Sequence, residues 1–172
     1  FNIVSKSKKL NGEFGDIRNY KKLNASIKKF QPEIIIHLAA QPLVRKSYDY
    51  PIDTFNTNFI GTMNILEALR NQKKCHSFIN ITTDKCYLNF DSNIPFKEDD
   101  PLGGLDPYSA SKASSEIITQ AYYHSYFKQN KSVGIATARA GNIIGGGDWS
   151  QDRLIPDLVR SFDTKKIVHI RS

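Results

Sequence analysis

The chain has 172 residues, of which 40% are hydrophobic, so it can bury one sizeable core but is short for two domains. It contains no apolar run of about 18 residues or more, and residues 1–10 lack the pattern of a signal peptide, so we expect a soluble, cytoplasmic protein without a membrane segment. The two cysteines, Cys75 and Cys86, lack the spacing of metal ligands, which argues against a disulfide framework and against a bound metal.

The formal net charge of +7 is concentrated before Pro32, where eight basic residues stand against Glu13 and Asp16. The basic residues are Lys6, Lys8, Lys9, Arg18, Lys21, Lys22, Lys28 and Lys29. Such a local excess can attract nucleic acid or a phosphorylated small molecule. Solvated helix faces explain it more simply, so we expect no nucleic-acid partner.

The first half of the chain alternates apolar runs with helical patterns, which indicates successive β-α units of a parallel sheet. Residues 34–40 form a short continuous apolar run, as expected for a strand covered on both faces. From Pro51 to Arg70 the spacing of apolar residues predicts a long helix with one buried stripe. The stripe consists of Phe55, Phe59, Met63, Leu66 and Leu69.

A second strand is predicted over residues 77–81, and it runs directly into the polar cluster Thr-Thr-Asp-Lys-Cys-Tyr at 82–87. Sheets of this kind carry their chemistry at the ends of strands, so this cluster is a candidate site. Residues 90–105 combine prolines, glycines and acidic residues, which predicts a loop.

The pair Asp106-Pro107 predicts the start of a helix, because aspartate caps helices and proline is tolerated at their first position. This helix is expected to run to Phe127. A further strand over 133–140 precedes a glycine-rich turn and a short helix near 155–162. The whole succession predicts an α/β fold with a doubly wound parallel sheet.

Tyr108 and Lys112 are four residues apart on this predicted helix and therefore share one face. An ammonium group beside a phenol favours the phenolate, so a tyrosine with an ordinary pKa of about 10 can act as a base near neutral pH. The pair is suited to removing a proton from a sugar hydroxyl. The spacing alone fits a surface tyrosine with a solvated lysine equally well.

Three further motifs accompany this pair in order along the chain: Ala39-Ala40-Gln41, Asn58-x-x-Gly61-Thr62 and Thr83-Asp84-Lys85. With them, essentially the whole chain resembles the extended short-chain dehydrogenase/reductase family, whose NAD-dependent epimerases and dehydratases act mostly on nucleotide sugars. The resemblance implies a Rossmann-like domain. No Gly-x-x-Gly-x-x-Gly turn precedes its first segment, so we expect a domain that is incomplete at both ends. The start of the sugar-nucleotide-binding region is expected at about 140–172.

Within that family, segments 37–45, 82–87, 106–112 and 139–149 look like those of the 4,6-dehydratases that act on CDP-glucose. Lys85 distinguishes these enzymes from the dehydratases for dTDP-glucose and GDP-mannose, which typically carry glutamate at this position. The resemblance implies NAD as cofactor and CDP-glucose as substrate. It also implies a possible homodimer through two long helices, and a role in making dideoxy sugars of the lipopolysaccharide O-antigen.

The resemblance assigns catalytic roles to five residues. Tyr108 takes the proton of the C4 hydroxyl, Thr83 hydrogen-bonds the same hydroxyl, and Lys112 holds the nicotinamide ribose. Asp84 and Lys85 are the acid and the base that eliminate water across C5 and C6, which yields CDP-4-keto-6-deoxyglucose. A lysine base must first lose its proton, which burial or the nearby Lys112 would favour. Taken alone, Asp84 and Lys85 equally fit an exposed ion pair.

The resemblance also assigns binding residues. The cofactor is expected against Asp16, Ile17, Ala39, Ala40, Gln41, Thr57, Asn58, Tyr108 and Lys112. The nucleotide sugar is expected against Asn142, Arg153, Leu154 and Arg171. An arginine suits a diphosphate through its paired donors, although Arg153 also fits a surface charge and Asp16 a helix cap.

Three alternatives stay open. A nucleotide-sugar epimerase would keep Tyr108 and Lys112 but would not need the pair Asp84 and Lys85 for an elimination. A non-catalytic binding or assembly module would fail to bind a nicotinamide cofactor. A basic nucleic-acid binder would show a steep salt dependence of its binding to a duplex.

Overall fold

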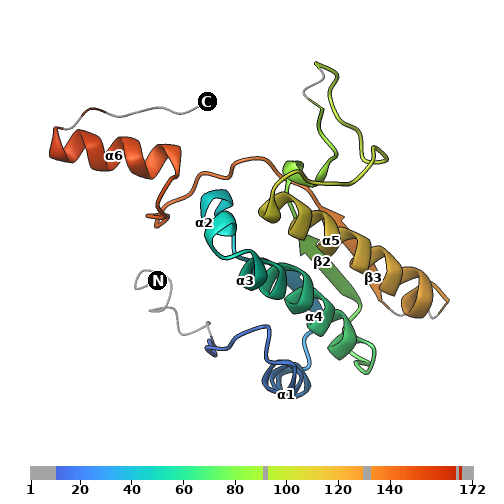
Figure 1. The fold of residues 1–172 in the computed structure, drawn as a ribbon. Coiled ribbons are helices and arrows are strands. Elements are labelled where there is room, and N and C mark those ends of the chain that lie inside the picture. The colour runs from blue at the N-terminus through green and yellow to red at the C-terminus, as the bar shows by residue number, and fades with distance from the viewer. Residues whose placement is uncertain (1–10, 91–92, 130–132, 166, 168–172) are drawn as a thin grey trace. The chain divides into compact units, whose positions relative to one another are not determined.

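The computed structural model describes residues 11–90, 93–129, 133–165 and 167, and these contain a parallel sheet. Its strands are β1 (Ile34–His37), β2 (Ser77–Ile81) and β3 (Gly134–Ala138), in the order β1-β2-β3 (Figure 1). His37 pairs with Asn80, and Ile81 pairs with Ala138. The carboxyl ends of all three strands therefore lie at one edge, and the predicted α/β class is confirmed.

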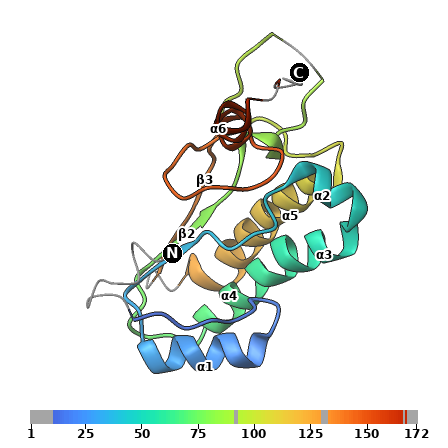
Figure 2. The same cartoon turned by 90° about the vertical axis from the view of Figure 1, so that its left-hand side faces the viewer.

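Helices connect and flank the strands. They are α1 (Tyr20–Phe30), α2 (Val44–Asp49), α3 (Pro51–Phe55), α4 (Gly61–Leu69), α5 (Pro107–Tyr122) and α6 (Leu154–Thr164). A π-helical turn, Asn56–Ile60, joins α3 to α4, and another, Tyr123–Phe127, continues α5. The long helices predicted over 51–70 and up to Phe127 are therefore confirmed, each with one widened turn. Figures 1 and 2 show α2 to α5 grouped together beside the strands.

Helix α5 begins where the sequence predicts. The Asp106 side chain accepts a hydrogen bond from the Ser109 amide at 3.0 Å and one from the Ser109 hydroxyl at 2.5 Å. Pro107 occupies the first position of the helix, where its missing N–H costs nothing. The cap holds the first turn of α5 in place, which matters because Tyr108 lies in that turn.

The core lies between the sheet and helices α4 and α5. It consists of Ile65, Leu66, Leu69, Cys75, Phe78, Phe127 and Val133. Leu66, Leu69 and Phe78 are fully buried, and each such side chain contributes about 1.5–3 kcal/mol by leaving water. The predicted stripe of residues 51–70 is thus confirmed at its C-terminal end, while Phe55, Phe59 and Met63 are half-buried.

One face of β1 is more exposed than the sequence predicts. Ile34 and Ile36 are 55% and 54% exposed, whereas the apolar run predicts a strand covered on both faces. Side chains alternate along a strand, so Ile35 packs against the core and its neighbours point to the other face of the sheet. Among the described residues, that other face has no covering as complete as the one that α4 and α5 provide.

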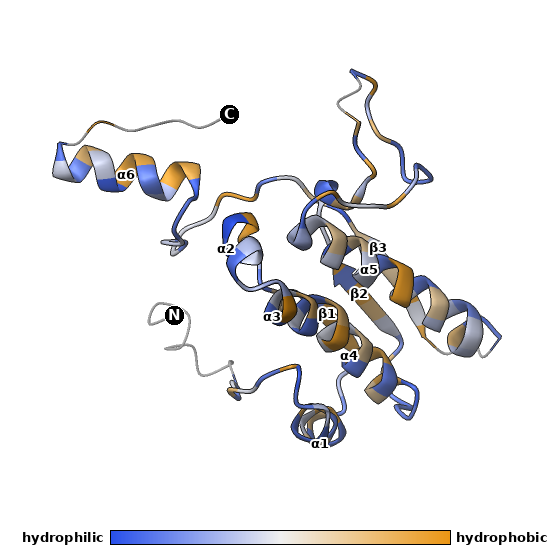
Figure 3. Cartoon of the chain, viewed as in Figure 1, coloured by the Kyte–Doolittle hydropathy of each residue, from blue (hydrophilic) through white to orange (hydrophobic). Residues whose placement is uncertain are grey.

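The chain divides into two compact units, residues 14–141 and residues 1–13 with 142–172. The first holds the sheet and α1 to α5. In the second, Arg160 of α6 donates to the Trp149 and Ser150 carbonyls at 2.9 and 3.0 Å and pairs with Asp157. Figure 3 shows apolar residues gathered on one side of α6 and polar residues on the other.

Within the described part of the chain, no helix is both long and apolar enough to cross a membrane.

Candidate active site

The polar cluster that follows β2 forms a tight turn. The Thr83 hydroxyl donates to the Asp84 carboxylate at 3.1 Å and accepts from the Lys85 amide at 3.3 Å. The Asp84 amide donates to the Ala140 carbonyl at 3.1 Å, which ties the turn to the segment after β3. Thr83 is buried, while the side chains of Asp84 and Lys85 are exposed. The turn therefore presents an acid and an amine from an anchored backbone.

Tyr108 and Lys112 lie on the face of α5 that is packed into the protein, with 9% and 6% of their surfaces exposed. The Tyr108 amide donates to the Ser47 hydroxyl of α2 at 3.1 Å. The Lys112 ammonium donates to the Ile81 carbonyl at 2.8 Å. Because Ile81 is the last residue of β2, this bond brings the helical pair to the same strand end as the turn of Thr83.

Burial sets the charge of two groups beside this strand end. It lowers the pKa of Lys112 to about 8, against the opposing effect of the Cys86 and Glu116 side chains. It also lowers the pKa of His37 to about 4, with a further contribution from the positive charge of Lys112. His37 is therefore neutral near pH 7, and its Nε2 lies 3.1 Å from the Thr62 hydroxyl.

At the end of β1, Ala39 is exposed and Ala40 half-buried, so small side chains leave this strand end open. The Asn58 side chain is buried and binds the Gln41 backbone at both its amide, 2.7 Å, and its carbonyl, 3.1 Å. It also donates to the Ser111 hydroxyl of α5 at 2.9 Å. Asn58 thus fixes the chain after β1 against α5. Thr57, beside it, is half-buried.

Asp16 and Ile17 lie in the segment before α1. Arg18 pairs with the Asp16 carboxylate at 2.6 Å and also with Asp53 of α3. The hydrogen bonds from Arg18 hold the pKa of the exposed Asp16 below its usual value. The Ile17 carbonyl accepts from Asn64 of α4 at 2.9 Å. This segment is therefore attached to the helices α3 and α4.

The residues predicted for the nucleotide sugar lie in the second unit. Asn142 is exposed, Arg153 is half-buried at the start of α6, and Leu154, the first residue of α6, is 55% exposed. Arg171 lies outside the described residues. These positions stay predictions, whereas Thr83, Tyr108 and Lys112 share one strand end.

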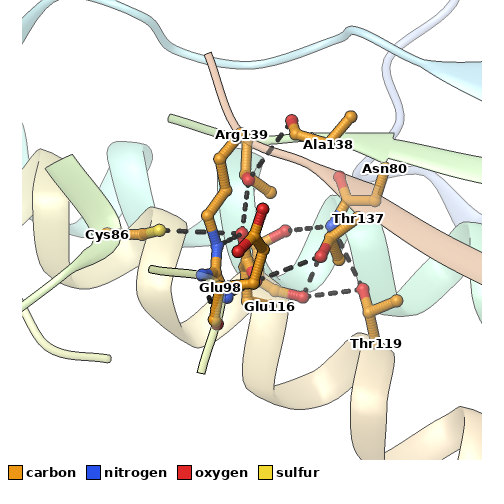
Figure 4. A network of polar contacts seen from close by, with 10 residues as sticks. Asn80, Cys86, Glu98, Glu116, Thr119, Thr137, Ala138 and Arg139 are labelled. Atoms are coloured by element: carbon orange, nitrogen blue, oxygen red, sulfur yellow. Dashed lines mark hydrogen bonds and ion pairs between the residues drawn. The ribbon is translucent and has the colours of Figure 1, made fainter. Parts of the chain in front are cut away.

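Sequence reasoning missed a buried carboxylate next to this strand end. Glu116 is fully buried on α5 and pairs with Arg139, which follows β3, at 2.7 Å (Figure 4). A signal was present, since Glu116 is four residues after Lys112 and so continues the face of Tyr108 and Lys112. The sequence does not reveal that this face is buried. No group of three or more potential metal ligands occurs among residues 11–90, 93–129, 133–165 and 167.

Solved structures confirm the fold class. A dTDP-glucose 4,6-dehydratase from Streptomyces venezuelae, solved with NAD bound, superposes with a TM-score of 0.83 over 95% of this chain and 48% of its own, at 26% identity. A dTDP-glucose 4,6-dehydratase from Bacillus anthracis, solved in complex with NAD, gives a TM-score of 0.76 over 96% of this chain and 49% of its own, at 29% identity. The fold of this chain is accordingly Rossmann-like.

Sequence comparison gives the family. Residues 2–145 match the family model described as GDP-mannose 4,6 dehydratase, and the chain belongs to this family within the extended short-chain dehydrogenases/reductases. The chain is 46% identical to the CDP-glucose 4,6-dehydratase of Salmonella typhimurium, over 100% of this chain and 49% of that protein. It is 33% identical to the dTDP-glucose 4,6-dehydratase of Haemophilus influenzae, over 64% of this chain and 36% of that protein. The chain spans at most about half the length of these relatives.

Proposed function

We propose that this chain supplies the catalytic residues of an NAD-dependent dehydratase that converts CDP-glucose to CDP-4-keto-6-deoxyglucose. The observation that carries the proposal is the bond from the Lys112 ammonium to the Ile81 carbonyl. It joins the helix of Tyr108 to the strand end that bears Thr83, Asp84 and Lys85. The 46% identity to the Salmonella enzyme supports CDP-glucose as the substrate.

The residues present fit a dinucleotide. The open end of β1 at Ala39 and Ala40 offers backbone without bulky side chains, and Lys112 brings a positive charge with several N–H donors to the neighbouring strand end. We assign the binding of NAD to these three residues with Gln41, Thr57, Asn58, Tyr108, Asp16 and Ile17. When bound, NAD accepts hydride from C4 of the sugar and returns it to C6.

Tyr108 begins the reaction by accepting the proton of the C4 hydroxyl as that carbon is oxidised. Thr83 hydrogen-bonds the same hydroxyl, and the Lys112 ammonium stabilises negative charge on the phenol oxygen. The product of this step is a 4-keto sugar, and its carbonyl acidifies the proton on C5.

Elimination of water then uses the turn after β2. Lys85 removes the C5 proton, and Asp84 donates a proton to the departing C6 hydroxyl. Both side chains are exposed at the end of β2, on a turn whose backbone is anchored to the segment after β3. Lys85 returns its proton to C5 when C6 is reduced. The balance is therefore one CDP-glucose to one CDP-4-keto-6-deoxyglucose and one water, and the cofactor ends the cycle oxidised.

We assign the recognition of the CDP group to Asn142, Arg153, Leu154 and Arg171, with the arginines pairing with the diphosphate.

We assign dimerisation to the outer surfaces of the helices over 51–70 and 107–127. Ile117 of α5 and Tyr126 of the following turn are 55% and 46% exposed and supply apolar area there.

The decisive assay incubates NAD and CDP-glucose with the chain alone and with the chain joined to the flanking segments of the Salmonella relative. We expect the 4-keto-6-deoxy product from CDP-glucose and not from dTDP-glucose or GDP-mannose. Replacement of the base in Lys85→Ala should lower kcat by about 10²-fold or more. A folded, flanked protein that binds no NAD would contradict the proposal, and a 4-epimer as product would indicate an epimerase.

A further inference from the structure

Glu116 is a fully buried carboxylate that joins three elements. Its Oε1 accepts from the Thr82 hydroxyl at 2.5 Å and from Arg139 Nε at 2.8 Å. Its Oε2 accepts from Arg139 Nη2 at 2.7 Å and from the Thr137 hydroxyl of β3 at 3.2 Å. Figure 4 shows Glu116 of α5 at the centre of this network.

Glu116 contacts both ends of the turn that carries the proposed acid and base. Thr82 immediately precedes Thr83, and the Cys86 thiol at the other end of the turn lies 3.6 Å from the same Oε1. Both ends of the segment 82–86 are therefore attached to one oxygen atom. Asp84 and Lys85, which are exposed, lie between these two attachment points.

Arg139 holds the carboxylate and extends the network. Its guanidinium stacks 4.6 Å from the ring centroid of Tyr87, the residue that follows the turn. Its Nη1 donates to the Glu98 carbonyl at 2.8 Å. The ion pair of Glu116 and Arg139 thus contacts the turn from the helix side and the chain immediately after the turn.

Stability alone is a weak explanation for such a pair. The cost of taking both charges out of water roughly cancels their attraction, so a buried ion pair often adds little to the free energy of unfolding. A fully hydrogen-bonded buried carboxylate does, however, hold its partners in one geometry. Catalytic side chains need their backbone held to within about 0.5 Å, which such a contact provides.

We propose that Glu116, oriented by Arg139, is a positioning residue that fixes the turn 82–86 so that Thr83, Asp84 and Lys85 meet the sugar. This inference rests on the proposed dehydratase function. It assigns Glu116 no contact with substrate. Its influence passes to the turn through the short hydrogen bond of the Thr82 hydroxyl, with the longer Cys86 contact as a second attachment.

The test replaces one hydroxyl at a time. Thr82→Val removes the hydrogen bond between the carboxylate and the start of the turn but retains the ion pair, the weaker Cys86 contact and the side-chain shape. Thr137→Val removes the other hydroxyl on the same carboxylate, and Thr137 lies in β3, away from the turn. Both proteins, with the flanking segments used for the dehydratase assay, are compared in steady-state kinetics and in amide hydrogen exchange.

We expect Thr82→Val to lower kcat with CDP-glucose by about 10²-fold with little change in KM, as a displaced turn would. Amide exchange should accelerate at Asp84, Lys85 and Cys86, while exchange in α1 and β1 stays as in the wild type. Thr137→Val should resemble the wild type in both measurements. If Thr82→Val lost activity only because the fold was destabilised, amide exchange would accelerate throughout the protein.

The inference is wrong if Thr82→Val turns over like the wild type, or if both variants lose activity equally. If the wild type converts no nucleotide sugar, the proposed function fails, and the exchange data still decide the positioning role. Faster amide exchange in the turn of Thr82→Val, but not of Thr137→Val, would support Glu116 as the residue that fixes the turn. Unchanged amide exchange in Thr82→Val would contradict that role.

Discussion

At the scale of single residues, two buried charges one helical turn apart determine the electrostatics behind the turn after β2. Burial lowers the pKa of Lys112 to about 8. Burial would raise the pKa of Glu116, but hydrogen bonds from Arg139 and Thr82 outweigh it and hold that pKa below its usual value. Near neutral pH both side chains therefore carry charge, of opposite sign. The sequence spacing predicts their common face, and only packing decides their burial.

The lowered pKa of Glu116 predicts a pH-dependent contribution to stability. A carboxylate whose pKa is lower in the folded state stabilises the protein above its unfolded value, and this stabilisation is lost as the pH falls through the folded value. A buried pair adds little as a whole, but removing one partner leaves the other charge buried without compensation. At neutral pH, Glu116→Gln should therefore lower the free energy of unfolding by about 3 kcal/mol, because it leaves the largely buried Arg139 without its counter-charge. In urea titrations, the difference from the wild type should shrink as the pH drops below the ordinary glutamate value of 4.5.

The matched control for this titration is Glu67→Gln, which removes the partly exposed pair of Glu67 with Arg70. Exposed pairs contribute about 0–1 kcal/mol, so this variant should stay close to the wild type at every pH. A Glu116→Gln difference that is constant from neutral to acidic pH would contradict a stabilising ionised carboxylate.

At the scale of elements, α5 places Tyr108, Lys112 and Glu116 on one face, and its first turn is held from two sides. Asp106 caps it, as the sequence predicts. Gly104 approaches it so closely that an added Cβ would lie 2.3 Å from the Ala110 nitrogen. The cap is predictable because its chemistry is local, but the approach of Gly104 is visible only when the loop is packed on the helix.

Gly104→Ala should therefore destabilise the protein by about 1–3 kcal/mol, because the new methyl group meets backbone that cannot rotate away. It should also lower kcat, since the first turn of α5 carries Tyr108. Gly12→Ala is the control, because an added Cβ there meets nothing within 4 Å. Urea denaturation of both variants tests the expectation, and a Gly104→Ala protein as stable as Gly12→Ala would refute the close contact.

At the scale of the whole molecule, the proposed homodimer depends on the outer surface of the two long helices. Ile117→Lys places a charge on that surface and should shift the protein from dimer to monomer in analytical ultracentrifugation. Ile94→Lys changes a residue of the same type that is 74% exposed in the loop before α5, and it should leave the dimer intact. A dimer that survives Ile117→Lys would place the interface elsewhere.

The sequence by itself determined the order of the three strands and of the helices over 51–70, from 106 to 127 and near 155–162, the cap of α5, and the common face of Tyr108 and Lys112. Periodicity, capping and motif spacing are local properties. The family followed from these motifs, and the comparisons confirm it. Only the tertiary structure decided that Ile34 and Ile36 are exposed and that Glu116 and Arg139 lie behind the turn. Burial depends on what residues distant in sequence place around a side chain, and no local pattern records that.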